Sequence, residues 1–209
     1  MRLTSLAAAT FVAALTSVGS ANIYGGAGGA LVDNGNAVFT INVADAGVVG
    51  TFNSVSLLNL VHDWCGDVQI TLTLPDSTVV SLVNRIGVPA TTSGDTSNFN
   101  GNYTFADSGF TPQLDGNIWT EAALGGTSYN LRSGIYAASG AGSGAGIPLN
   151  PLIAGHSVTG AWKLTVSDLA LFNSGTLGSW SLDFSVVPAP AGVAVVALSG
   201  LFAGRRRRA

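Results

Sequence analysis

The segment Gly160–Asp168, with the sequence GAWKLTVSD, decides the fold class. Within it, Trp162, Leu164 and Val166 alternate with Lys163 and a threonine. Side chains on a β-strand point to opposite faces in turn, so alternation of this kind places one face in a core and the other in solvent. The segment therefore predicts a half-buried strand of a sheet.

A second segment of the same kind closes the domain. Trp180, Leu182 and Phe184 alternate with Ser181 and Asp183. Each tryptophan can bury on the order of 200 Å². The two segments therefore predict a pair of strands that contribute much of the core.

Other stretches predict further strands, separated by turns and loops. Residues 86–101 and 111–146 lack a clear pattern, the latter including a flexible loop at 139–146, and no helix of useful length is expected between the strands. Many short strands with turn signals predict an all-β fold, an antiparallel, jelly-roll-like β-sandwich. The additional strands are expected at 37–43, 52–61, 68–74, 78–83 and 103–105.

The first 21 residues are typical of a signal peptide. Arg2 supplies a positive charge, Leu3–Val18 is apolar, and Gly19-Ser20-Ala21 offers small residues for signal peptidase. A buried N-terminal helix is the alternative. We expect residues 22–36 to be a loose glycine-rich lead-in and 37–186 to be the domain.

The tail at 187–209 has its own pattern: two prolines, an apolar run at 191–204 and four arginines. This layout resembles a PEP-CTERM sorting signal, which implies an exported, surface- or matrix-associated protein, transient anchoring in the membrane and cutting by an exosortase. Ala189 stands where the usual motif has glutamate. A plain membrane anchor is the alternative. The residues that carry the pattern are Pro188, Pro190, Arg205, Arg206, Arg207 and Arg208.

Charge limits the partners of the domain. The chain has 8 basic and 11 acidic residues, and Arg2 and the tail arginines are five of the 8, so the remainder has a net charge of 3 − 11 = −8. Such a field repels nucleic acid and anionic membranes and favours cations. The single cysteine, Cys65, cannot form an internal disulfide, and we expect it to be a small apolar residue near a turn.

Several motifs, in order between Phe52 and Phe184, resemble the P (Homo B) domain of subtilisin-like proprotein convertases. The resemblance implies a β-sandwich jelly roll that packs on a serine protease and stabilises it. Val68, Ser77 and the residue after Tyr136 depart from the usual pattern. The matching segments are Leu60–Pro75, with the core HDWCGDV, Tyr103–Asp107, Ser133–Tyr136, Gly160–Asp168, Gly175–Leu177 and Trp180–Leu182.

The sequence offers little for catalysis. Its two histidines, His62 and His156, lie outside any motif of serine-protease catalysis, and two histidines with one cysteine are few for zinc. We expect His62, Asp67 and Asp168 to fix turns at strand ends. Calcium is the one cofactor that the acids favour, because hard cations bind carboxylates on loops. The leading ligands are Asp67 and Asp107, and the weaker candidates are Asp63, Asp95 and Asp168.

Three functions remain open at this point. The first is a non-catalytic structural or adhesive module at the cell surface or in the matrix. The second is an accessory domain for a serine endopeptidase, and the third is a jelly roll that binds carbohydrate such as exopolysaccharide. For the third, Trp64, Trp119, Tyr129 and Tyr136 are the aromatic side chains that would stack on sugar rings.

Overall fold

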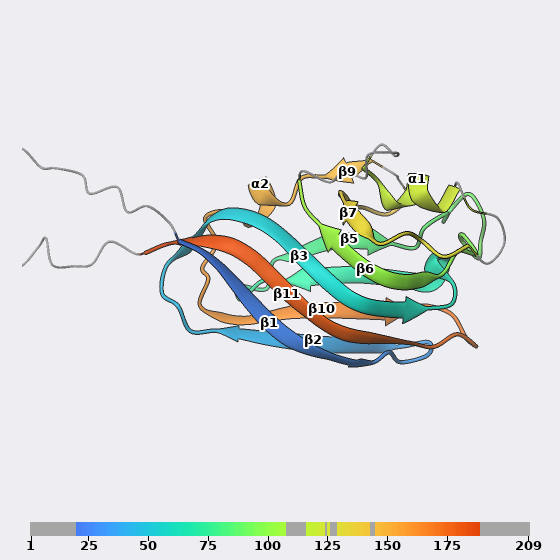
Figure 1. Cartoon of the computed structure of the whole chain (residues 1–209), viewed down its shortest axis with the longest axis horizontal. Helices are drawn as coiled ribbons and strands as arrows, with labels where there is room; N and C mark the ends of the chain where they lie inside the picture. Colours follow the sequence, from blue (N-terminus) through green and yellow to red (C-terminus); the bar gives the residue numbers. More distant parts are fainter. Residues whose placement is uncertain (1–19, 108–115, 124, 126–128, 143–144, 189–209) are drawn as a thin grey trace, which may run out of the picture.

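The computed structural model describes residues 20–107, 116–123, 125, 129–142 and 145–188. They form two packed sheets, one in the order β1-β11-β3-β6-β7 and the other in the order β2-β10-β4-β5 (Figure 1). The strands are β1 (Ser20–Ala30), β2 (Asn36–Val43), β3 (Val48–His62), β4 (Val68–Thr73), β5 (Val79–Asn84), β6 (Phe99–Phe105), β7 (Gly134–Tyr136), β8 (Ala138–Ser139), β9 (Gly146–Ile147), β10 (Gly160–Asp168) and β11 (Gly175–Val187). The helices are η1 (Cys65–Asp67), α1 (Ile118–Ala123) and α2 (Asn150–Ile153).

The strand pairing is that of a jelly roll. β1 pairs with β11, β2 with β10, β3 with β6 and β4 with β5, all antiparallel. In each sheet, a strand from near the start of the described chain therefore pairs with a strand from near its end. The all-β sandwich predicted from the sequence is confirmed, with β6 and β7 as a short parallel pair.

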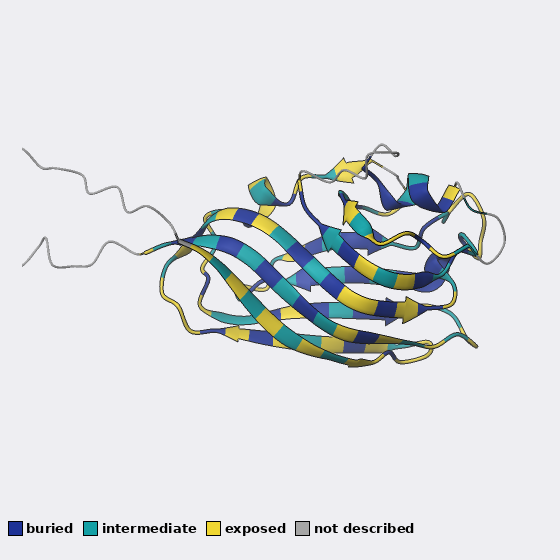
Figure 2. Cartoon of the chain, in the orientation of Figure 1, coloured by how far each residue is buried: buried dark blue, intermediate teal, exposed yellow. Residues whose placement is uncertain are grey.

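The core lies between the two sheets and is built around the two predicted tryptophans. Trp162 of β10 and Trp180 of β11 lie in opposite sheets and are at most 1% exposed. The ring of Phe184 stacks on Trp162 at a centroid distance of 5.2 Å. Buried and exposed residues alternate along the long strands (Figure 2), as the period of two predicted.

The expected loose lead-in at 22–36 is wrong for most of its length. Residues up to Ala30 belong to β1, which pairs with β11 from Ser20 to Ala30. Two inward-facing glycines allow β1 to pack closely in this position. A Cβ on Gly26 would lie 2.7 Å from Nε1 of Trp180, and one on Gly28 would lie 2.1 Å from the Leu177 carbonyl oxygen. The glycines let an edge strand close over a bulky partner, which composition alone does not reveal.

The structure adds elements where the sequence predicted loops. β6 begins at Phe99, inside the expected loop 86–101. α1, β7 and β8 lie within 111–146, where no element was expected, and β9 begins at the last residue of that stretch. Both α-helices are at most six residues long. In the part of the chain that is described, no helix has the length and apolar character to cross a bilayer.

The two ends of the chain are only partly described. The predicted end of the signal peptide, at Ala21, falls inside β1. Residues 1–19 lie outside the described residues, as do Pro190 and the four arginines of the tail. Pro188 is described and exposed, directly after β11. Ser20 and Pro188 lie at the same end of the sandwich (Figure 1).

Candidate functional site

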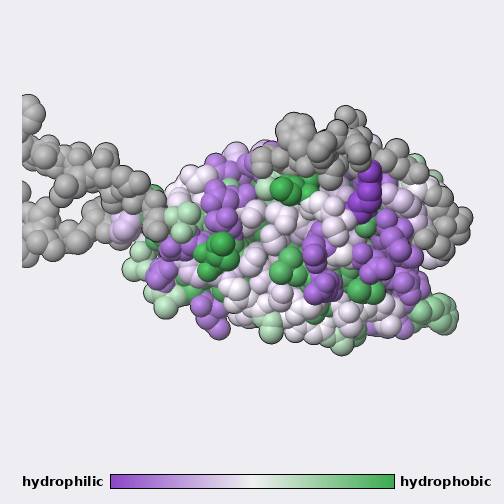
Figure 3. Space-filling model, viewed as in Figure 1, coloured by the Kyte–Doolittle hydropathy of each residue, from purple (hydrophilic) through white to green (hydrophobic). Residues whose placement is uncertain are grey.

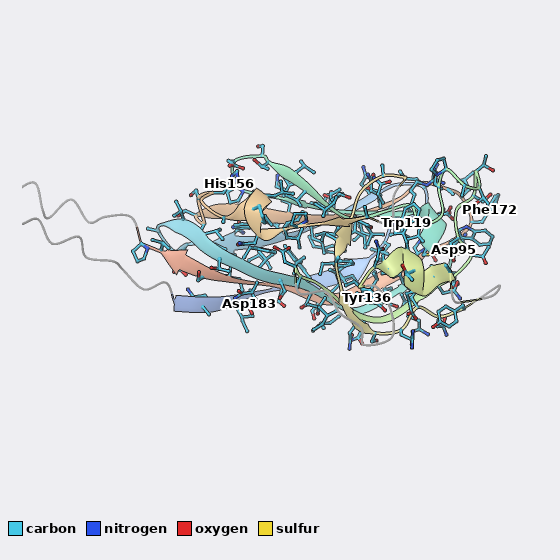
Figure 4. All side chains as sticks on the ribbon, turned by 90° about the horizontal axis from the view of Figure 1, so that it is seen from above. Asp95, Trp119, Tyr136, His156, Phe172 and Asp183 are labelled. Atoms are coloured by element: carbon cyan, nitrogen blue, oxygen red, sulfur yellow. The ribbon has the colours of Figure 1, made fainter. Side chains whose placement is uncertain are left out.

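Loops from both sheets meet at the end of the sandwich opposite to Ser20 and Pro188. We call this region the loop end. Figure 4 shows Phe172 and Asp95 at this end, and His156 and Asp183 in the other half of the molecule. The loop end consists of residues 31–35 between β1 and β2, 63–67 after β3, 85–98 between β5 and β6, and 169–174 between β10 and β11.

A buried histidine and carboxylate join the two sheets below the loop end. His62 ends β3 in one sheet, and Asp168 ends β10 in the other. Nε2 of His62 lies 3.0 Å from Oδ2 of Asp168, and both residues are at most 3% exposed. Oδ1 of Asp168 accepts the backbone N–H of Ala170 at 3.1 Å. The pair therefore fixes two strand ends and the start of the loop after β10, the role expected from the sequence.

Asp67 lines an open pocket of about 280 Å³ at the surface of the loop end. Its Oδ2 accepts a hydrogen bond from Nδ2 of Asn173 at 3.3 Å, and its Oδ1 lies 4.0 Å from Nη2 of Arg85. Burial raises the pKa of Asp67 above its usual value, although Asn173 and Arg85 act in the opposite direction. A desolvated carboxylate in a pocket is a common mark of a binding site. The other lining residues are Trp64, Thr92, Ser93, Ala170 and Leu171.

Four non-glycine residues of the loop end have positive φ: Asn34 at 49°, Trp64 at 148°, Arg85 at 41° and Phe172 at 86°. Positive φ is uncommon outside glycine and asparagine, and is a genuine outlier for bulky side chains. Backbone strain of this kind costs on the order of 1–3 kcal/mol per residue and clusters at functional sites. Of the three bulky residues among them, Trp64 and Arg85 line the pocket, and Phe172 belongs to the loop beside it.

The loop 169–174 exposes apolar side chains to solvent. Phe172 is 93% exposed, and Leu171 and Leu169 are 56% and 44% exposed. The backbone N–H of Phe172 donates to Oδ1 of Asp33 at 3.1 Å, which holds the tip of the loop against the turn between β1 and β2. Figure 3 shows an apolar projection at this end of the molecule. A phenylalanine held outward in a strained conformation is a strong signal of a contact surface.

Two glycines allow the other loops to pack closely. A Cβ on Gly66 would lie 2.5 Å from the Ser93 carbonyl oxygen, and one on Gly94 would lie 2.5 Å from the Cα of Gly66. Residue 66 must therefore be glycine because Ser93 and Gly94 approach it closely. Cys65 beside it is fully buried, and burial raises the pKa of its thiol. Cys65 is thus the small buried residue near a turn that was expected.

The structure does not bring Asp67 and Asp107 together, which corrects the expected shared calcium site. Asp67 lies at the loop end, whereas Asp107 follows the opposite end of β6, about 20 Å away along that strand. The oxygens of Asp107 accept the backbone N–H groups of Leu149 and Asn150 at 2.5 and 3.0 Å. Asp63 is exposed next to His62. Among the described residues, no three acidic, histidine or cysteine side chains form a metal-binding group.

The carboxylate of Glu121, a second buried acid, is also hydrogen-bonded within the protein. Oε1 of Glu121 accepts hydrogen bonds from the Tyr129 hydroxyl at 2.6 Å and from Nε of Arg132 at 2.8 Å. Burial alone would raise the pKa of Glu121, but these bonds outweigh it and hold the pKa below its usual value.

Tyr136 is fully buried and donates to the Arg132 carbonyl oxygen, so it cannot stack on a sugar. Trp64, Trp119 and Tyr129 are partly exposed.

Asp67 was among the residues predicted from the sequence, but most of the loop end was not. Arg85 and Asn173 lie outside the predicted strands, and nothing in their spacing indicates that they face Asp67. The apolar run Leu169-Ala170-Leu171-Phe172 was a usable signal. Four apolar residues between a strand that ends at Asp168 and a polar link are unusual for a surface loop.

Comparisons with known proteins add few facts. No model of a known protein family matches the sequence, and no curated protein matches it. Solved structures that resemble the chain are those of a serine protease of Aeromonas sobria, in complex with its chaperone (17% identity, TM-score 0.44) and alone (15% identity, TM-score 0.41). Each match covers 81% of this chain and 28% of the other. The chain thus spans under a third of the length of those chains.

Proposed function

We propose that this chain is an exported, non-catalytic module of the P-domain type that binds a protein partner through its loop end. The observation that carries the proposal is the exposed, strained Phe172 beside a pocket that contains a desolvated carboxylate. Aromatic side chains that project from a rigid scaffold are typical anchors of protein interfaces. The sandwich supplies that scaffold, and its loops supply the surface.

The bonding of the reactive side chains supports a binding role over catalysis. His62 is fully buried against Asp168 and presents no surface to a substrate. The carboxylate of Glu121 is occupied by Tyr129 and Arg132. Each of these groups has a structural task in the fold. We therefore propose that the contacts of the loop end, and no covalent chemistry, are the function of the module.

The P-domain motifs make a serine endopeptidase the first partner class to test. In this proposal the domain acts in trans, as an accessory that stabilises the protease or assists it. The signal peptide and sorting tail that the sequence predicts support a place at the cell surface or in the matrix, reached with the help of signal peptidase and an exosortase-like enzyme. Carbohydrate is the less favoured ligand, because Tyr136 is buried and the loop end exposes aliphatic side chains as well as aromatic ones.

The test is direct binding of the full chain to secreted endopeptidases of the same organism, measured by surface plasmon resonance, together with the thermal half-life of the protease. We expect binding and a longer half-life. The double variant Leu171→Ser, Phe172→Ser should weaken binding by at least about thirtyfold, because loss of an aromatic anchor costs about 2 kcal/mol or more.

The matched control is Val79→Ser on β5, which removes a side chain that is 60% exposed at a distance from the loop end. It should bind like the wild type. Equal binding by the loop variant would refute the loop end as the binding surface. Binding to a glycan array with no protease binding would replace the protein partner by a sugar. Turnover of a peptide or sugar substrate that His62→Ala abolishes would refute the non-catalytic role.

A further inference from the structure

The two long sides of the sandwich differ in how their sheet edges end. On one side, the edges are β1 of the five-stranded sheet and β2 of the four-stranded sheet, and the two strands contact each other. On the other side, the edges are β7 and β5. An edge strand exposes unpaired N–H and C=O groups, which are a template for another strand.

The side with β7 and β5 is protected. β7 has only three residues. β5 contacts the β8–β9 hairpin, and the hydroxyl of Ser81 donates to the Ser139 carbonyl oxygen at 2.8 Å. A short edge strand and a covering segment are two of the devices by which soluble proteins prevent edge-to-edge pairing.

The side with β1 and β2 has none of these devices in the described part of the chain. β1 is eleven residues long and pairs with β11 without a register shift, so no bulge turns it away. Neither strand contains a proline or a charged residue. Asp45, outside both strands, bonds the side chains of Asn22 and Tyr24 and no backbone group of the edge. The region around β1 is mostly pale, hence neither strongly polar nor strongly apolar, in Figure 3.

We infer that β1 is a self-association edge, at which two copies of this chain pair their β1 strands antiparallel and join their five-stranded sheets into one. An antiparallel contact of a strand with itself is two-fold symmetric, so one unprotected edge is complementary to its own copy. The outward side chains of β1 are small except for Ile23, which is 75% exposed and would gain cover from the second copy.

Charge favours a second copy at this edge over most other faces. The full chain has a net charge of −3, and the chain without Arg2 and the tail arginines has 3 − 11 = −8, so two copies repel each other in either form. The uncharged β1 and β2 strands let two copies approach with little local repulsion. It follows that the association should strengthen when added salt screens the net charge.

The test is the mass of the purified full chain by sedimentation velocity over a range of concentrations, at low and moderate salt. We expect a reversible dimer that salt favours. Gly25→Lys places a charge in the middle of the edge, where a Cβ meets no atom within 4 Å, and it should weaken dimerisation at least about tenfold. Val79→Lys adds the same charge on β5 and should leave the dimer unchanged.

A second measurement covers the case in which Gly25→Lys disturbs the fold. Cysteine is placed singly at the outward positions Ile23, Gly25 and Ala27 in a Cys65→Ala background, and the chain is oxidised gently. In an antiparallel two-fold pairing, only a residue next to the two-fold axis lies near its own copy, so a disulfide-linked dimer at one of these positions would locate that axis. A single-chain mass at all concentrations refutes the inference. So does a dimer that both lysine variants weaken equally.

Discussion

Two adjacent glycines of β1 provide a stringent test of the fold. Gly25 and Gly26 differ only in the direction in which a side chain would point. A Cβ on Gly25 meets nothing within 4 Å, whereas one on Gly26 would lie 2.7 Å from Nε1 of Trp180 and 2.8 Å from Cγ1 of Ile41. Because neither residue has positive φ, alanine is compatible with the backbone at both positions.

The expected effects have opposite signs. Gly25→Ala restricts the unfolded chain and should be neutral or stabilising by up to about 1 kcal/mol. Gly26→Ala forces a methyl group against two core side chains and should destabilise by about 1–3 kcal/mol. For a domain of this size, 1 kcal/mol shifts the melting temperature by about 2–4 °C. We therefore expect Gly26→Ala to melt about 2–12 °C below the wild type, and Gly25→Ala at or slightly above it.

Thermal unfolding followed by circular dichroism, at a concentration low enough to keep the chain monomeric, measures the difference. Equal melting temperatures for the two variants would mean that β1 does not pack over Trp180. In that case the glycine-rich segment would be a loose lead-in after all, and the self-association edge would lose its basis.

Three further predictions concern the acids. Asp107→Ala should lower the free energy of unfolding by about 1 kcal/mol, because the carboxylate accepts hydrogen bonds from the backbone at the start of α2. The loss should be the same with calcium and with a chelator. A loss of stability seen only with calcium would support a metal site at Asp107. Asp67→Asn should leave the melting temperature at pH 7 unchanged or raise it. The pKa of Asp67 is raised in the folded state, so above that pKa the charged carboxylate destabilises the fold. A clear loss of unfolding free energy in chemical denaturation would contradict this. The folded pKa of Glu121 is lowered, so its charge stabilises above the unfolded value of about 4.5, and that contribution disappears as pH falls through the folded pKa. Glu121→Gln should accordingly lose less stability than the wild type between pH 5 and pH 3, and parallel pH profiles would refute this.

Strands in which apolar and polar residues alternate strictly could be predicted from sequence, because a period of two residues fits few structures other than a β-strand. β4 and β10 follow the expected alternation at nearly every position. β1 could not be predicted in the same way. Its inward positions include Gly26 and Gly28, which carry no hydrophobic signal because the space in front of them is filled by the Trp180 side chain and the Leu177 backbone. A pattern search detects side chains that fill a core, and it cannot detect glycines that leave room for one.

The contacts of Asp67 in the candidate site could not be predicted from the sequence either. Asp67 could be singled out because hard cations bind carboxylates on loops. Its partners Arg85 and Asn173 are 18 and 106 positions further along the chain, and only the two-sheet topology places them together. The expected pairing of Asp67 with Asp107 was wrong for a related reason. Two acids near strand ends can belong to opposite ends of the sandwich, and sequence order alone does not say which.

The direction of β1 links the two proposed surfaces. Ser20 lies opposite Val186, close to Pro188, and Ala30 lies next to Thr176 at the loop end. Antiparallel pairing of β1 with a second copy reverses that copy, so the two loop ends face opposite directions. The binding surface of each copy then stays uncovered in the dimer. By the same geometry, the two tail attachments after Pro188 leave from opposite ends. If the predicted tail anchored two copies in one membrane, those copies could not pair in this way, whereas unanchored copies, or copies on two facing surfaces, could.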